Sequence, residues 1–162
     1  IRSKNPDGIF VPGYYTEVAL IARQARELGL NVPLMGGDGW DSPKLIENGG
    51  KAVDNNYFSN HYSPESKDPR VVDFVAKYKQ AYGSVPDSLA AMGYDAALIL
   101  ADAMKRAPSL TNTAIRDAIA ATQKFAAVTG VISIDANRNA TKSAVVMKVE
   151  NGQLRFQTTI QP

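Results

Sequence analysis

The chain has 162 residues, of which 44% are hydrophobic and 21% charged, a composition typical of about one ordinary globular domain rather than of a disordered segment. Eighteen basic and sixteen acidic residues leave a formal charge of +2 and are interspersed, so no nucleic-acid-binding stretch is indicated. No apolar run approaches the roughly 20 residues that span a bilayer, and the absence of cysteine excludes disulfides, thiolate metal sites and cysteine nucleophiles.

The N-terminal third alternates short apolar runs with an amphipathic segment. Residues 7–11 (DGIFV) are typical of a strand buried in a parallel sheet. A helix is expected over 17–28, with Thr16 as its N-cap and a glycine at its end. A second apolar run at 32–35 precedes a glycine-rich loop at 36–40. Strand, helix and strand in this order predict a right-handed parallel crossover.

The middle of the chain is predicted to be mainly helical. Ser42 and Asp68 each precede a proline, which is the arrangement of an N-cap followed by the first helical residue. Four helices are expected, over 43–48, 69–82, 88–105 and from Thr111 or Asn112 to about Thr122. The segment 52–62 is interpreted as extended. Apolar residues of the third helix cover more than one stripe, so this helix is expected to be packed on most sides.

The C-terminal part is predicted to be rich in strands. Strands are expected over 131–134, 143–149 and 154–160. The last two are separated by Asn151-Gly152, a strong signal for a two-residue hairpin turn. The chain is therefore assigned to the α/β class, with a mixed sheet edge and a C-terminal β-hairpin.

Four segments together resemble the leucine/isoleucine/valine-binding family of periplasmic proteins, the type I solute receptors of ABC transporters. They are PDGIFVPGYY (6–15), RQARELG (23–29), MGGDGWDSP (35–43) and GYDAA (93–97). Their order and spacing extend over nearly the whole chain, which makes the resemblance specific. It covers the C-terminal part of a family member only, so the chain is expected to be a fragment.

The resemblance implies parts of two Rossmann-like lobes, with a ligand held between them. Residues 1–61 and 143–162 would form a portion of the C-terminal lobe, and 62–142 a portion of the N-terminal lobe. Hinge crossings are expected near 60–63 and 139–142.

Two residues match the ligand contacts of the family, namely Tyr14 after the first strand and Asp38 after the second. Ligand crevices of open α/β sheets lie outside the carboxyl ends of the strands, which places both residues there on independent grounds. An amino acid is a zwitterion, and a carboxylate at Asp38 can bind its ammonium group, while the Tyr14 phenol can hydrogen-bond and cover an aliphatic stem. Asp38 could instead accept backbone N–H groups of its own turn. Trp40 could line the cleft or pack within the loop.

The function implied by the resemblance is that of an extracytoplasmic solute-binding component of a branched-chain or related amino-acid ABC transporter. The expected partners are an amino acid, a membrane permease and the missing N-terminal half, or a second copy of the fragment. A periplasmic or extracytoplasmic location follows from the same resemblance. The alternative is a ligand-sensing regulatory domain of the same fold, for amides or aromatic acids.

No catalytic residue, cofactor or metal is expected. The signatures of nucleotide-binding loops, serine hydrolases and zinc proteases are not found. His61 has no carboxylate close to it in the sequence, so a surface or hydrogen-bonded role is expected. Residues 135–139 imitate the start of a calcium loop, but Ala140 and Val146 occupy the positions of its glycine and glutamate.

Overall fold

The computed structural model describes all 162 residues and divides them into two compact units. The first unit comprises Ile1–Glu65 and Val145–Thr159, and the second comprises Ser66–Ala144 and Ile160–Pro162. The assignment of these units to lobes of a longer protein, and the crossings near 60–63 and 139–142, stay predictions. No helix of the chain combines the length and the apolar character that crossing a bilayer requires.

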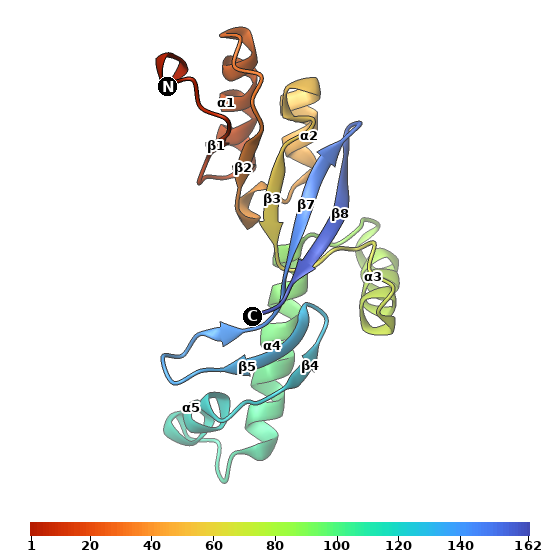
Figure 1. The fold of residues 1–162 in the computed structure, drawn as a ribbon. Helices are drawn as coiled ribbons and strands as arrows, with labels where there is room; N and C mark the ends of the chain where they lie inside the picture. Colours follow the sequence, from red (N-terminus) through yellow and green to blue (C-terminus); the bar gives the residue numbers. More distant parts are fainter. The chain divides into compact units, whose positions relative to one another are not determined.

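A five-stranded sheet forms the centre of the first unit, with the order β1-β2-β3-β7-β8 (Figure 1). Its strands are β1 (Ile9–Phe10), β2 (Leu34–Gly36), β3 (Tyr57–Asn60), β7 (Ala144–Glu150) and β8 (Gln153–Ile160). The first three strands are parallel, and β7 runs antiparallel to β3 with Met147 opposite Phe58. The predicted α/β class with a mixed edge is therefore confirmed.

Two helices, α1 (Tyr15–Glu27) and α2 (Pro43–Gly49), supply side chains to the core of this unit. Short 3-10 helices lie at η1 (Arg2–Lys4), η2 (Asp38–Trp40) and η3 (Gly50–Val53). The core combines residues of both helices with residues of the sheet, among them Val18, Leu34, Leu45, Phe58 and Met147. Alternation along the strands leaves Phe10 and Met35, which are paired neighbours, exposed on the sheet.

Strand β8 is attached to the segment that follows β3 through one carboxylate. Glu65 accepts a hydrogen bond from the backbone N–H of Phe156 at 3.0 Å and one from the Arg155 guanidinium at 2.6 Å. Both bonds lower the pKa of the Glu65 carboxyl, and the bond from the Phe156 backbone N–H has the larger effect. The C-terminal strand is thus held at a second point besides its ladder with β7.

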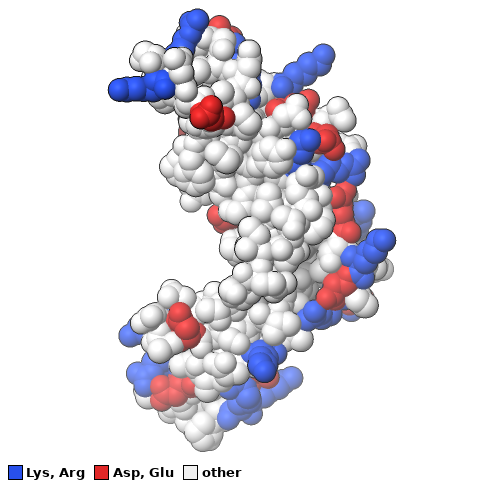
Figure 2. Space-filling model, in the orientation of Figure 1, with Lys and Arg blue, Asp and Glu red and all other residues white.

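The second unit contains three helices and a three-stranded antiparallel sheet. The helices are α3 (Pro69–Tyr82), α4 (Ser88–Arg106) and α5 (Asn112–Ala120), and the strands are β4 (Phe125–Ala127), β5 (Gly130–Ile134) and β6 (Ala140–Thr141). The short strands β4 and β6 were not predicted from the sequence. On the face drawn in Figure 2, basic and acidic side chains are interspersed in both units.

Local signals set most of the element boundaries. The side chains of Ser42 and Asp68 accept the predicted N-cap hydrogen bonds, and Thr111, one of the two starts expected for the fourth helix, is its N-cap. Asn151 and Gly152 have φ angles of 51° and 69°, as a type I′ hairpin turn requires.

Two local predictions were wrong. Thr16 is not an N-cap, because α1 begins two residues earlier than expected, at Tyr15, and its N-cap is Tyr14. The expected extended segment 52–62 begins instead with the end of the 3-10 helix η3, and only Tyr57–Asn60 is a strand.

Helix α4 differs from its prediction in burial. It was expected to be packed on most sides, but only Ser88, Ala91, Asp95 and Ala103 are buried. Leu89 and Leu100 are 63% and 44% exposed, and a Cβ atom added at Gly93 would meet no atom within 4 Å. The reason is that α5, β4 and, through the Phe74–Tyr94 ring pair, α3 contact the helix without surrounding it, which leaves an apolar stripe with Leu89 and Leu100 exposed.

Asp95 fastens α4 to the turn between β4 and β5. Its carboxylate is 2% exposed and accepts the backbone N–H groups of Val128 and Thr129, both at 2.8 Å. A buried donor without an acceptor costs about 1–3 kcal/mol, so this carboxylate stabilises the turn it binds. The GYDAA segment therefore has a structural role within the second unit.

Replacing Asp95 with alanine should leave two backbone N–H groups without their acceptor and lower the free energy of unfolding by about 2–4 kcal/mol. Urea unfolding followed by circular dichroism measures the change. The matched control is Asp73→Ala on α3, which removes an exposed carboxylate paired with Lys77 at 2.7 Å and should change stability by about 0.5 kcal/mol or less. Equal effects of the two substitutions would show that Asp95 has no special role.

Candidate functional site

Three loops meet at the carboxyl edge of the parallel strands. Tyr14 follows β1 as the N-cap residue of α1, Asp38 follows β2 as the first residue of η2, and His61 directly follows β3. Because β1, β2 and β3 are parallel neighbours, the residues that follow them lie at the same edge of the sheet.

The Asp38 carboxylate is paired with a histidine from the neighbouring strand. Asp38 Oδ2 lies 3.2 Å from His61 Nε2, and the two side chains are 49% and 34% exposed. An ionised carboxylate can only accept hydrogen bonds, so this contact requires a proton on Nε2. About half of the Asp38 side chain stays open to solvent, where a cationic group can approach it.

The Tyr14 ring contacts the loop that carries Asp38. A Cβ atom placed on Gly39 would lie 3.0 Å from Tyr14 Cδ1 and 2.8 Å from the Gly13 carbonyl oxygen. Only a glycine allows this approach, which brings the phenol ring beside the Asp38 loop. The ring is 69% exposed and can offer its free face to a guest molecule.

Trp40 packs within the loop and does not line a cleft. Its side chain is fully buried, its ring lies 6.1 Å from the Phe58 ring, and its Nε1–H donates to the Val11 carbonyl oxygen at 3.2 Å. Gly36 has no room for a side chain, because a Cβ atom there would lie 2.2 Å from the indole. Of the two interpretations left open by the sequence, the packed loop aromatic is therefore the correct one.

Sequence reasoning missed the pairing of His61 with Asp38. The two residues are 23 positions apart in the sequence, and no local motif links them. Their common place after consecutive parallel strands is the signal that could have joined them. The buried Asn60 side chain accepts the His61 backbone N–H at 2.8 Å and so fixes the start of this loop.

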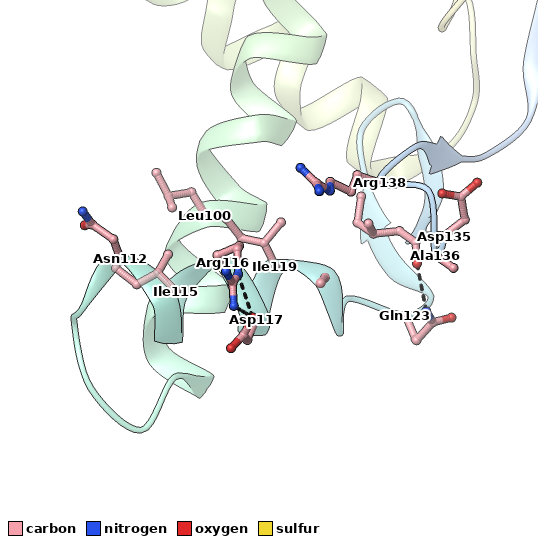
Figure 3. A pocket seen from close by; sticks show the side chains of 12 residues that line it. Leu100, Asn112, Ile115, Arg116, Asp117, Ile119, Gln123, Asp135, Ala136 and Arg138 are labelled. Carbon is pink, nitrogen blue, oxygen red and sulfur yellow. Dashed lines mark hydrogen bonds and ion pairs between the residues drawn. The ribbon is translucent and has the colours of Figure 1, made fainter.

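A separate hollow of about 1000 Å³ lies in the second unit (Figure 3). Its apolar lining includes Leu100, Ile115 and Ile119. Neither Tyr14 nor Asp38 lines it.

The carboxylates that line this hollow are already engaged. Asp117 pairs with Arg116 at 2.6 Å. Asp135 accepts the backbone N–H groups of Asn137 and Asn139 at 2.8 Å each, and the bond from Asn139 contributes most to lowering the pKa of the Asp135 carboxyl. Nowhere in the chain do three or more His, Cys, Asp or Glu side chains lie close enough together to hold a metal ion. The hollow is therefore better suited to apolar groups than to a zwitterionic amino acid.

Comparison with known proteins gives consistent matches. A family model described as "Periplasmic binding protein" matches residues 1–153. Two proteins of Brucella abortus strains, each called Leu/Ile/Val-binding protein homolog 2, are 28% identical over 153 residues, which is 91% of this chain and 40% of each relative.

Solved structures of two relatives resemble the chain closely. The leucine-binding protein LivK of Thermotoga maritima is 46% identical with a TM-score of 0.93, over 99% of this chain and 46% of that protein. The substrate-binding protein LivJ of Streptococcus pneumoniae, solved with isoleucine, is 33% identical with a TM-score of 0.85, over 96% and 45%. The chain thus spans less than half the length of these relatives.

A Gly36→Ala substitution should displace the indole beneath the Asp38 loop and lower the free energy of unfolding by about 1–3 kcal/mol through overpacking. Trp40 is the one tryptophan of the chain, so its fluorescence emission should shift to the red as the ring loses its buried place. Gly37→Ala is the matched control, because a Cβ atom there meets nothing within 4 Å. If both variants kept the emission and stability of the parent chain, the close packing of Gly36 and Trp40 would be refuted.

Proposed function

This chain belongs to the periplasmic binding protein family, and we propose that it forms the C-terminal part of an extracytoplasmic receptor for a branched-chain amino acid. The receptor would present this amino acid to the permease of an ABC transporter. The observation that carries the proposal is the half-open Asp38 carboxylate at the carboxyl edge of the parallel strands. The similarity to LivK and LivJ supports an aliphatic amino acid as the ligand.

Asp38 supplies the charge that an amino acid requires at one end. The ammonium group of a zwitterion carries three donors and a full positive charge, and an ionised carboxylate is its natural acceptor. A hydrogen bond of this charge-assisted kind contributes roughly 1.5–3 kcal/mol, or one to two decades in affinity. We propose that the carboxylate of the ligand is bound by donors from the part of the receptor that lies outside this chain.

Tyr14 would form an aromatic wall beside the ammonium site. Its ring is held against Gly39, next to Asp38, and its outer face is exposed. An aromatic face can cover an aliphatic stem, while the phenol oxygen can hydrogen-bond to the polar end of the same ligand. We therefore infer that Tyr14 contacts both parts of a bound branched-chain amino acid.

The proposed mechanism is binding coupled to closure, with no covalent step. A ligand that contacts both lobes of the complete receptor stabilises the closed conformation by its higher affinity for that conformation. The permease would then receive the closed, loaded receptor. None of the residues at the Asp38 edge is assigned a catalytic role.

In the complete receptor, Asp38→Ala should lower the affinity for leucine or isoleucine by about tenfold or more without unfolding the protein, because the ammonium group loses its acceptor. Calorimetry gives the affinity, and thermal denaturation checks the fold. The control is Asp7→Ala, which removes an exposed carboxylate that precedes β1. Unchanged affinity in folded Asp38→Ala would remove this residue from the site.

The chain on its own should bind amino acids only very weakly, because the donors for the ligand carboxylate are proposed to lie outside it. The apolar stripe of α4 around Leu89, Gly93 and Leu100 should also lead the chain to self-associate, since an uncovered apolar surface favours a partner. Calorimetry and light scattering of the isolated chain measure these two properties. Micromolar affinity would contradict the first expectation, and a monomer the second.

A further inference from the structure

We propose that His61 is a positioning residue for the carboxylate that binds the ligand ammonium, and that it thereby favours amino acids over acids without an amino group. The inference rests on the proposed function of Asp38 as the ammonium acceptor. It concerns a residue that would act through Asp38 and would not itself touch the ligand.

His61 directly follows the sheet, and its imidazole reaches across to the loop after β2. His61 follows the last residue of β3, and the buried Asn60 side chain accepts its backbone N–H at 2.8 Å. From this place Nε2 lies 3.2 Å from Asp38 Oδ2. The loop after β2 is thus tied to the end of a neighbouring strand through the same carboxylate that is proposed to bind the ligand.

The contact restrains the Asp38 side chain. The backbone of the loop is already set by the 3-10 helix η2 and by the close packing of Gly36 on Trp40 and of Gly39 on Tyr14. A carboxylate that samples several rotamers loses conformational freedom when a ligand fixes it, and this loss opposes binding. A hydrogen bond from His61 removes part of this freedom before the ligand arrives.

The pairing leaves room for the ligand. An ionised carboxylate has two oxygens with about four lone-pair sites, and the contact with His61 uses Oδ2 only. With 49% of the side chain exposed, an ammonium group can approach Oδ1 while the imidazole stays in place. His61 is therefore expected to support the bound state and not to compete with the ligand.

The expected selectivity for amino acids over acids without an amino group follows because His61 contacts Asp38 and not the ligand. Because His61 acts on the ligand only through Asp38, its effect should be felt by a ligand with an ammonium group. An acid of the same shape without that group has nothing to gain from an ordered Asp38. The ratio of the two affinities therefore separates a positioning role from a general structural role.

The experiment compares leucine with 4-methylpentanoate, which is leucine without its amino group, by calorimetry on the complete receptor. His61→Ala should lower the affinity for leucine by about three- to tenfold, in line with one lost hydrogen bond, and leave the affinity for 4-methylpentanoate unchanged. His61→Gln keeps an N–H donor without the ring and should restore leucine affinity to within about twofold of the parent. In an Asp38→Ala background, which lacks the acceptor, His61→Ala should have no further effect on leucine.

Each arm has an outcome that overturns the proposal. Equal losses for leucine and 4-methylpentanoate in His61→Ala would make the residue merely structural, and a gain in leucine affinity would make it a competitor. Full leucine affinity in His61→Ala would also refute the positioning role. The Asp38→Ala arm is read separately: unchanged leucine affinity there would refute the ammonium site itself, and with it the role of His61.

Discussion

The hydrogen bond between the Trp40 indole and the Val11 carbonyl oxygen holds the candidate site together. It joins the loop after β2 to the residue that follows β1, across 29 positions of the sequence, and it lies inside the core. A buried indole N–H needs an acceptor, and its large ring fills the space that Gly36 leaves open. Because Trp40 is fixed in this way, Asp38 and the Tyr14 loop are kept at the same edge of the sheet.

The same principle operates at other points of the chain, where buried polar side chains bind backbone groups that would otherwise lack partners. Asn56 is fully buried and accepts the Leu34 backbone N–H at 2.9 Å and the Arg26 guanidinium at 3.0 Å. In the second unit, the Asp95 carboxylate accepts two backbone N–H groups of the turn after β4. Such contacts stabilise a unique arrangement, since removing one partner leaves the other buried without a hydrogen bond.

Much of this organisation could be predicted from the sequence, and the remainder depends on long-range contacts. Local chemistry located the caps at Ser42 and Asp68 and the Asn151-Gly152 turn, because each depends on neighbouring residues only. The order of strands placed Tyr14 and Asp38 at one edge, and the contact of Tyr14 with Gly39 agrees with that placement. The burial of Trp40, the partner of His61 and the open side of α4 depend on tertiary packing, for which a single sequence has no local signal.

One carboxylate has the central place in the proposed function: Asp38, tied to His61 after β3 and half exposed, would bind a positively charged nitrogen. The most direct test is a crystal structure of the complete receptor with leucine, measuring the distance between the leucine nitrogen and the nearer Asp38 carboxylate oxygen. The account predicts a distance of about 2.7–3.2 Å, with the His61 contact retained. A leucine nitrogen bound to other groups, with Asp38 directed away from it, would contradict the account.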